Sequence, residues 1–280
     1  MEFRHKYGVM GAGMVGRSLI GRLSANGIKL GPVAAVSYRV ASRIANSLKG
    51  GFAAREPAEL DDVGAVLFHA PPDQLAALLE ALEASKISWP GRSLIVCDCD
   101  VTPAVTHRFR QEGASIAVAR QFGVAGRVVL EGSGRALILA HRLARETHLK
   151  AVEIRPGSAD LFDAAITLST CAITPLIDQT AALLRDAGVR ELDAPRLASA
   201  LFEQAAAGYA HSGKQSWGWY IRGPEVQRIL AQTDAAQINA AETGEMFRML
   251  LLFGLGMFGK HPDLANMLGE WPAAPSIDPA

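Results

Sequence analysis

A glycine-rich stretch near the start of the chain restricts the possible folds more than any other feature. A short apolar run at residues 7–10 leads into Gly11-Ala12-Gly13-Met14-Val15-Gly16, and an amphipathic helical pattern follows to about residue 25. The spacing Gly-x-Gly-x-x-Gly between a strand and a helix is typical of a dinucleotide-binding turn. A plain packing turn is the simpler interpretation. The position between strand and helix, and a second strand at the expected distance, favour the dinucleotide site.

Each glycine is expected to meet a different requirement. Gly11 permits a sharp turn out of the strand, and the missing Cβ of Gly13 lets a pyrophosphate approach the backbone. Gly16 is expected to let the following helix pack close to the strand. The N–H groups and the dipole at the start of that helix would then face the phosphates. The predicted pyrophosphate-binding residues are Gly11, Ala12, Gly13, Met14, Val15 and Gly16.

The end of the second expected strand, residues 32–37, indicates which dinucleotide binds. Folds that hold NAD usually place Asp or Glu there to bind the ribose 2′-hydroxyl. This chain has Ser37 and Arg39 instead, followed by Arg43. Two guanidinium groups without a carboxylate suit a 2′-phosphate, so the residues favour NADP over NAD. The alternative is that both arginines are only solvated at the start of a helix.

Further apolar runs predict the rest of a parallel sheet. One buried strand ends at His69 and is followed by Ala70, Pro71 and, after a second proline, Asp73. Loops at the carboxyl ends of parallel strands line the ligand crevice. Ala70, Pro71 and Asp73 are therefore expected to form a wall of the nucleotide site, and His69 to serve as a packing or ribose contact rather than in catalysis.

A later strand carries two of the three cysteines. In Cys97-Asp98-Cys99-Asp100 the two-residue alternation of a strand predicts both cysteines on one face. No further Cys or His follows at ligand spacing, so no metal site is expected. An odd number of cysteines without a disulfide framework is typical of reduced thiols in the cytoplasm.

Pro156-Gly157 ends the strand pattern and marks the expected domain boundary. Residues 1–156 are expected to form the nucleotide-binding domain and residues 157–280 an all-helical domain. Its first helix, residues 159–187, has a polar stripe at three- and four-residue steps. The stripe consists of Asp163, Thr167, Thr170, Thr174 and Asp178. It is either the solvated side of the helix or the substrate side of an interdomain cleft.

Composition excludes several classes of partner. The chain has 28 basic and 28 acidic residues, so no net charge would attract nucleic acid or an anionic membrane surface. The start of the chain does not resemble a signal peptide, and the apolar run at residues 249–258 is too short to cross a bilayer. A cytoplasmic protein that binds a small-molecule substrate is expected, with neither nucleic acid nor membrane as partner.

The glycine motif, the loop after His69 and the helical second half resemble the 6-phosphogluconate-dehydrogenase-like superfamily. The resemblance is strongest to bacterial NADP oxidoreductases with a Rossmann-like domain and a helical domain, through residues 128–132, 161–165 and 220–223. The sequence also resembles pyrroline-5-carboxylate reductase, but more distantly. The resemblance implies a Rossmann-like doubly wound parallel sheet followed by an all-α domain like the 6-phosphogluconate dehydrogenase C-terminal domain. It also implies a homodimer formed through the helical half, with residues 246–258 as one surface.

The chain departs from that pattern where the family has its catalytic groups. The family commonly has Lys, then Tyr-His, then Ser-Asn along the long helix, where this chain has Ala159, Phe162-Asp163 and Thr170-Cys171. Asp163 is the expected proton donor if burial keeps it protonated, with Thr167 and Thr170 orienting the substrate. Two hypotheses remain open. The first is an NADP(H)-dependent oxidoreductase that transfers hydride to or from a small C=O or C=N substrate in the interdomain cleft. The second is a nucleotide-binding sensor or regulatory protein of the same fold with weakened catalysis.

Overall fold

A computed structural model describes residues 4–99, 101, 103–122, 126–219, 226–258 and 262–269. The chain divides into two compact units, Met1–Ala164 and Ala165–Ala280. The division falls within a helix, slightly beyond the boundary expected after residue 156.

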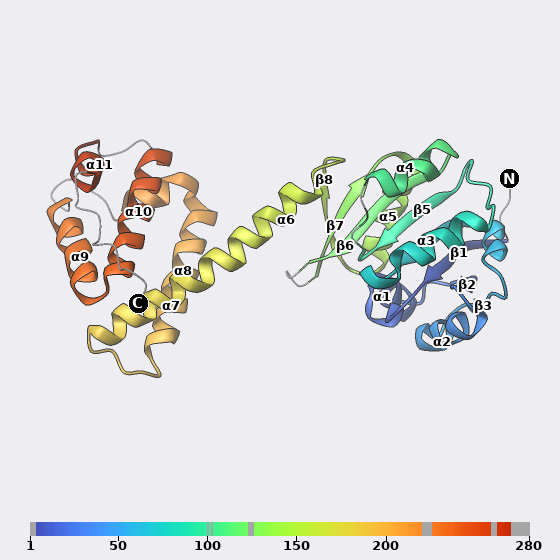
Figure 1. Cartoon of the computed structure of the whole chain (residues 1–280), viewed down its shortest axis with the longest axis horizontal. Coiled ribbons are helices and arrows are strands. Elements are labelled where there is room, and N and C mark those ends of the chain that lie inside the picture. The colour runs from blue at the N-terminus through green and yellow to red at the C-terminus, as the bar shows by residue number, and fades with distance from the viewer. Residues whose placement is uncertain are drawn as a thin grey trace, which may run out of the picture. The chain divides into compact units, whose positions relative to one another are not determined.

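The first unit is built on a sheet that has eight strands in the described residues, in the order β3-β2-β1-β4-β5-β6-β7-β8 (Figure 1). All neighbouring strands are parallel except β6 and β7. The strands are β1 (His5–Gly11), β2 (Pro32–Ala34), β3 (Phe52–Ala53), β4 (Val63–His69), β5 (Ser93–Cys97), β6 (Ser115–Gln121), β7 (Arg127–Gly132) and β8 (Lys150–Ile154). The predicted Rossmann-like fold is confirmed, although the sheet is not wholly parallel. Residues 122–126 are too few for the crossover that a parallel β6–β7 pair would need.

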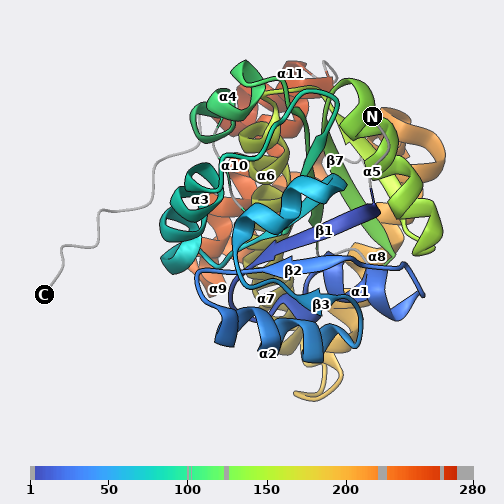
Figure 2. The same ribbon diagram turned by 90° about the vertical axis from the view of Figure 1, so that its right-hand side faces the viewer.

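Helices cover both faces of this sheet. They are α1 (Leu19–Ala25), α2 (Tyr38–Leu48), α3 (Leu75–Ala84), α4 (Pro103–Gln111) and α5 (Gly134–Glu146). One buried apolar cluster joins α1, α2 and α5 to the sheet, and a second joins α3 and α4 to its other face. Figure 2 shows α2 beside β2 and β3. Alternate strand residues supply the two clusters, as Val9 and Met10 of β1 illustrate.

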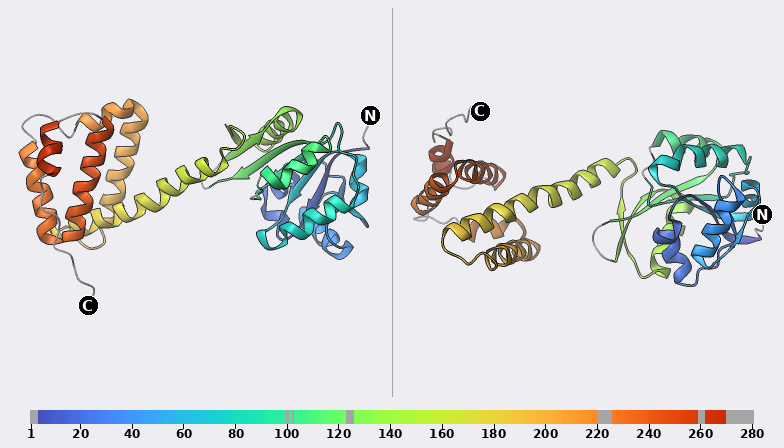
Figure 3. Two further views of the ribbon diagram at one scale, coloured as in Figure 1. Left: turned by 45° about the horizontal axis from the view of Figure 1, so that its top comes forward. Right: turned by 60° about the horizontal axis from the view of Figure 1, so that its bottom comes forward.

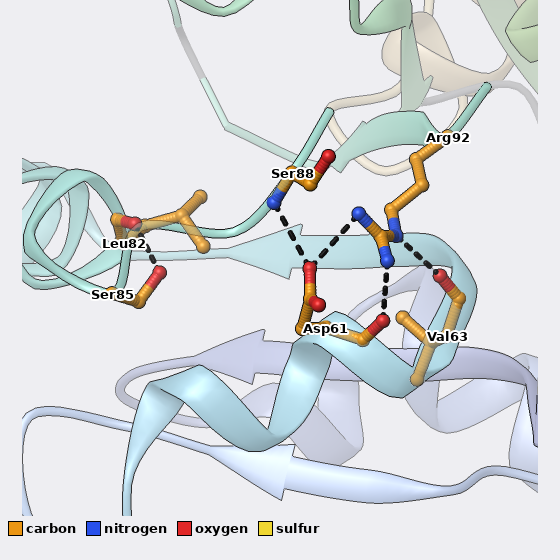
Figure 4. Close-up of polar contacts among 6 residues, drawn as sticks. All are labelled: Asp61, Val63, Leu82, Ser85, Ser88 and Arg92. Carbon is orange, nitrogen blue, oxygen red and sulfur yellow. Dashed lines mark hydrogen bonds and ion pairs between the residues drawn. The ribbon is translucent and has the colours of Figure 1, made fainter. Parts of the chain in front are cut away.

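A buried arginine links the segment before β4 to the start of β5 (Figure 4). The Arg92 side chain is only 2% exposed and lies 2.9 Å from the Asp61 carboxylate. Its guanidinium also donates to the carbonyl oxygens of Val63 (3.2 Å) and Asp61 (2.5 Å). The same carboxylate accepts from the N–H of Ser88 at 2.9 Å. These contacts compensate for burying a charge beside the sheet.

The second half of the chain is helical throughout its described residues, as predicted. Its elements are α6 (Ala159–Thr167), a π-helical turn (Leu168–Ala172), α7 (Ile173–Asp186), α8 (Ala194–Ser212), a 3₁₀ segment (Gly213–Trp219), α9 (Val226–Asn239), α10 (Ala241–Phe258) and α11 (Pro262–Gly269). The first three form one continuous helix over residues 159–186, which confirms the long helix expected there. Figure 3 shows α9 and α10 side by side.

The apolar pattern after residue 234 predicts a long helix that begins at Asp234, and this prediction is wrong. Asp234 lies inside α9, and the new helix α10 begins only at Ala241. The chain turns at this point because Gly244 packs against the backbone of Gln237, where an added Cβ would lie 2.5 Å from its Cα. This close approach is a tertiary contact, and the turn itself contains neither Pro nor Gly. The sequence pattern therefore does not reveal where α9 ends.

Within the described residues one segment, 159–186, is long and apolar enough to cross a membrane by length and composition alone. The mean hydropathy of its most apolar window is 1.3, and none of that window is buried. Asp163 and Asp178 lie within this segment and interrupt its apolar surface.

Candidate nucleotide-binding site

The carboxyl end of β1 presents a run of backbone amides without hydrogen bonds. The N–H of Ala12 donates to the carbonyl of His69 (2.9 Å), and the N–H of Arg17 donates to that of Met14 (2.8 Å). The amides between them form no hydrogen bond within the described part of the chain. They belong to Gly13, Met14, Val15 and Gly16. Consecutive unpaired amides in a turn make a concavity that binds anions, so this loop suits a diphosphate.

The helix after the glycine motif starts later than predicted. Val15–Arg17 form a single 3₁₀ turn, and α1 begins at Leu19. Ser18 separates the two because its backbone is extended and its hydroxyl oxygen accepts from the N–H of Ile20 (3.2 Å). The donors available to a phosphate are therefore turn amides rather than the first amides of α1.

Gly16 packs against a helix and not against the strand as predicted. A Cβ at Gly16 would lie 2.5 Å from Oγ of Ser47 in α2. A Cβ at Gly21 of α1 would in turn lie 2.0 Å from the carbonyl oxygen of Gly16. The loop is thus held between α1 and α2, and both glycines are required by close approach rather than by φ.

The loops after β1 and β4 meet at the same edge of the sheet. Gly13 has φ +68°, and a Cβ there would lie 3.0 Å from the ring of Pro71. Ala70 is buried and donates its N–H to Sγ of Cys99 (3.0 Å). Asp73 is exposed in the turn that follows. The structure therefore brings Gly13, Ala70 and Pro71 together, with Asp73 at the periphery.

The residues expected to bind a 2′-phosphate lie where β2 passes into α2. Ser37 is the N-cap of α2, and its side chain makes no capping hydrogen bond. Arg39 and Arg43 are exposed and lie four residues apart, on one face of the helix. Neither guanidinium forms an ion pair within the described part of the chain. A hydroxyl and two guanidinium groups are thus available at a helix N-terminus, an arrangement that suits a phosphate.

Asp98 is a residue of this edge to which the sequence assigned no role. Its carboxylate accepts from the N–H of Leu19 at the start of α1 (2.6 Å) and from the N–H and side-chain amide of Gln121 (2.7 and 3.1 Å). A negative charge at a helix N-terminus is stabilising. Asp98 therefore ties the helix behind the glycine loop to the ends of β5 and β6. The feature of the sequence that could have identified Asp98 is a carboxylate at the end of a buried strand.

The same residue overturns the prediction that Cys97 and Cys99 share a face. Asp98 has φ +50°, in the left-handed region, so the strand ends at Cys97 and its alternation stops. Cys97 belongs to the cluster beneath α1 and α5, and Cys99 to the cluster on the opposite face. Burial raises the pKa of the Cys97 thiol, and the neighbouring Asp98 adds to the effect. No metal-binding group of His, Cys, Asp or Glu exists among the described residues.

Asp163, at the start of α6, forms an ion pair with Arg120 of β6 at 2.8 Å. The Asp163 side chain is 52% exposed, whereas that of Arg120 is 16% exposed. The burial expected to keep Asp163 protonated is therefore not found. Two hollows of about 370 and 300 Å³ flank the pair. One is also lined by Cys99 and Glu131, and the other by Asp98.

Thr167 and Thr170 belong to the second unit and are exposed. The hydroxyl of Thr170 donates to the carbonyl of Ile166 (2.9 Å), within its own helix. Thr167 precedes the π-helical turn Leu168–Ala172, and Thr170 lies within it. Such turns are frequent at functional sites, but here Pro175 accounts for it, because proline lacks an N–H and its ring clashes with the carbonyl one turn earlier.

Neither a family model nor a curated protein sequence matches the chain. Solved structures match it over nearly its full length. An imine reductase from Bacillus cereus is 15% identical with a TM-score of 0.60, covering 96% of this chain and 100% of that one. The chain has the fold of the imine reductases. A reductive aminase from Aspergillus terreus, solved with NADPH and ethyl levulinate, is 16% identical with a TM-score of 0.57, covering 95% and 99%. A protein from Bacteroides fragilis named as a candidate NADP oxidoreductase is 13% identical with a TM-score of 0.67, covering 93% and 99%. At these identities the fold is what is shared, and it agrees with the predicted resemblance.

Proposed function

We propose that this protein is an NADP(H)-dependent oxidoreductase that transfers hydride to or from a small C=O or C=N substrate. One observation carries the proposal: four consecutive unpaired amides at the end of β1 lie one strand away from the unpaired Arg39 and Arg43. Solved structures of the same fold include a reductive aminase in complex with NADPH and an imine reductase from Myxococcus stipitatus in complex with NADP+.

The residues present fit the cofactor. The amides of residues 13–16 would bind its diphosphate, and Ser37, Arg39 and Arg43 its 2′-phosphate. Gly13 has a positive φ and packs closely against Pro71, so a residue with a side chain there would disturb the loop that carries these amides. The bound nicotinamide would supply the hydride chemistry, while the protein binds and orients the cofactor.

The substrate-binding part of the proposal rests on the polar groups at the start of the long helix. Asp163 and Arg120 present opposite charges between two hollows. We propose that this pair contacts the polar end of a small substrate, and that Thr167 and Thr170 help to orient it in the interdomain cleft that the sequence predicts. The pairing of Asp163 also bears on the second hypothesis. The Asp163 carboxylate is paired with Arg120 rather than buried alone, so a sensor or regulatory protein with weakened catalysis remains the alternative to the oxidoreductase.

The test separates cofactor binding from turnover. Calorimetric titration of the wild-type protein with NADPH and NADH should show tighter binding of NADPH. The double variant Arg39→Ala/Arg43→Ala should lose about 1–3 kcal/mol of NADPH binding free energy, or roughly 5- to 150-fold in affinity, and leave NADH unaffected. Arg145→Ala is the matched control, because Arg145 is an exposed arginine on a helix of the same unit without an ion pair among the described residues.

Each outcome has one interpretation. Equal losses for NADPH and NADH would contradict the 2′-phosphate assignment, and binding of neither would overturn the whole proposal. NADPH oxidation on a panel of cyclic imines and keto acids supports the oxidoreductase. Tight NADPH binding without oxidation on any member of the panel supports the sensor instead.

We further propose that the helical half forms a homodimer. Apolar side chains remain exposed along its helices, among them Leu168 (69%) and Phe253 (68%). A groove of about 800 Å³ within the second unit is lined by apolar residues of α7, α9 and α10. Exposed apolar surface of this extent on a globular protein marks an interaction site. Residues 246–258, the predicted surface, contribute Phe253 and Met257 to the groove.

Light scattering after size-exclusion chromatography tests the homodimer. The wild-type protein should have twice the mass of one chain, and Phe253→Glu should shift it to a single chain while the far-UV circular dichroism spectrum stays unchanged. Phe52→Glu is the control, because Phe52 is a similarly exposed phenylalanine on the sheet of the first unit. A single-chain mass for the wild-type protein at working concentration would contradict the homodimer.

A further inference from the structure

A hollow of the first unit lies at the edge of the sheet opposite the glycine loop. Its volume is about 930 Å³, which is within the range of small-molecule sites. Its lining comes from the starts of β1, β4 and β5 and from one face of α5. The seven residues of β1 separate it from the loop by about 20 Å at the usual rise per strand residue. A ligand here would not occupy the proposed cofactor site.

Small side chains create this hollow. Tyr7, Ala65, Ser93 and Ser115 lie side by side across four neighbouring strands. Of these four residues, Ala65 and Ser93 line the hollow, and both have small side chains. The first residue of α5, Gly134, also lines the hollow and has no side chain. Because these positions lack bulk, the sheet and α5 do not close on each other at this end.

The charge of the lining is of one sign. Lys6, Arg135 and Arg142 line the hollow together with His5, and none of the described lining residues is acidic. Arg135 is fixed in place because its guanidinium donates to the carbonyl of Gly91 (2.5 Å) on the opposite rim. Lys6 and Arg142 form no ion pair within the described part of the chain. In a chain with no net charge, such a local excess of cations favours an anionic ligand.

An unpaired hydroxyl inside the hollow is an independent sign of a ligand. Ser93 is fully buried, and its Oγ has no hydrogen-bond partner among the described residues. Buried hydroxyls are almost always paired, so a partner from outside the chain is expected. The first amides of α5 also indicate a ligand. Ala136 donates to Oγ of Ser115 (2.9 Å), whereas the amides of Gly134 and Arg135 have no partner in the described chain.

Most of the remaining lining is apolar. Ala65, Pro90, Ile138 and Leu139 contribute, and Ile138 is 67% exposed. A large aliphatic side chain left this exposed beside a cationic rim suits a ligand whose body is apolar and whose head is charged. A small inorganic anion would leave that wall in contact with water.

We propose that this hollow is a second binding site, distinct from the cofactor site, for an organic anion with an apolar body. Its charged head lies against the Ser93 hydroxyl, Arg135 and the first amides of α5, and its apolar body lies along Ile138 and Leu139 toward Arg142. The head is a carboxylate or a phosphate ester, since both accept hydrogen bonds from a guanidinium in the same geometry.

Calorimetric titration with octanoate tests the proposal on the full chain. Octanoate should bind saturably with one site per chain, whereas octanamide, which has the same body without the charge, should bind at least about tenfold more weakly. Acetate and inorganic phosphate, which lack the apolar body, should also bind at least about tenfold more weakly. Octyl phosphate replaces octanoate in a parallel series, and saturable binding of either one supports the site.

Variants locate the binding. Arg135→Ala and Ser93→Ala should each weaken octanoate about tenfold. Arg145→Ala should leave octanoate binding unchanged, because Arg145 is an exposed arginine of the same helix that does not line the hollow. NADPH binding should be unaffected by saturating octanoate. Absence of saturable binding of both octanoate and octyl phosphate would overturn the proposal. Equal binding of octanamide, or undiminished binding to Arg135→Ala, would overturn it as well. Because NADPH titration is a separate measurement, failure here is distinguishable from failure of the proposed function.

Discussion

Replacing Asp98 by asparagine tests whether this carboxylate holds the glycine loop in place. Asparagine has nearly the same shape and tolerates the left-handed backbone, φ +50°, better than most residues. The substitution therefore removes the charge and one acceptor oxygen without straining the turn. Any loss must come from the contacts with Leu19 and Gln121.

The magnitude follows from those contacts. The carboxylate accepts from two backbone N–H groups through different oxygens, at 2.6 and 2.7 Å. Asparagine can accept only one of them, and its NH₂ group then faces the other donor. The retained bond loses its charge-assisted part, roughly 1 kcal/mol, and the unpaired donor costs roughly 1–3 kcal/mol. Since Asp98 is partly exposed, we expect a total near the lower end, about 2–3 kcal/mol of unfolding free energy.

Urea unfolding followed by circular dichroism measures this loss, and NADPH titration measures its effect on the loop. Asp98→Asn should lower the unfolding free energy of the first unit and weaken NADPH binding severalfold. Asp62→Asn is the matched control, because Asp62 is exposed and its side chain makes no hydrogen bond among the described residues. The reasoning is refuted if Asp98→Asn unfolds within about 0.5 kcal/mol of the wild type, the range typical of neutral surface changes.

Two further predictions concern buried groups of the same sheet. Arg92→Leu should destabilise the protein by about 2–5 kcal/mol in urea unfolding, because it leaves the carbonyls of Val63 and Asp61 without their donor; a loss below about 1 kcal/mol would contradict this role. Burial raises the pKa of the Cys97 thiol, so at neutral pH it stays protonated and unreactive, and reactivity appears only as the pH rises toward that raised value or as the protein unfolds. Iodoacetamide should therefore modify Cys97 in urea but not in the folded protein, as read by peptide mass spectrometry; rapid modification of Cys97 in the folded protein would count against its burial.

Much of the first unit could be predicted because its strands are buried on both faces. Such strands consist of nearly continuous apolar runs, as in β4 and β5, and these are visible in the sequence. The glycine motif then orients the sheet, since its loop must lie at the carboxyl end of β1. Helix α4 is difficult to predict because its apolar stripe is weak. Three of its nine residues are basic: His107, Arg108 and Arg110.

The details of the site were less predictable because they depend on contacts distant in sequence. Ser18 delays the start of α1, and Asp98, which caps that helix, lies 79 residues from Leu19. Arg120 pairs with Asp163 across 43 residues. Polar residues in such pairs carry no periodic signal of their own. Periodicity predicts which face of an element is buried, but not which of its polar residues finds a partner.

The two proposed sites bind anions by different physical means, and the difference follows from the direction of the strands. At the carboxyl edge, β1 ends in a glycine turn whose unpaired amides attract a diphosphate without any charged side chain. At the amino edge the anion is held by the Ser93 hydroxyl and the first amides of α5, together with the side-chain charges of Lys6, Arg135 and Arg142 around the hollow. Exposed side-chain charges are screened by salt more strongly than fixed backbone dipoles at close range. Octanoate binding at the amino edge should therefore weaken with ionic strength, even though its apolar body favours the opposite trend.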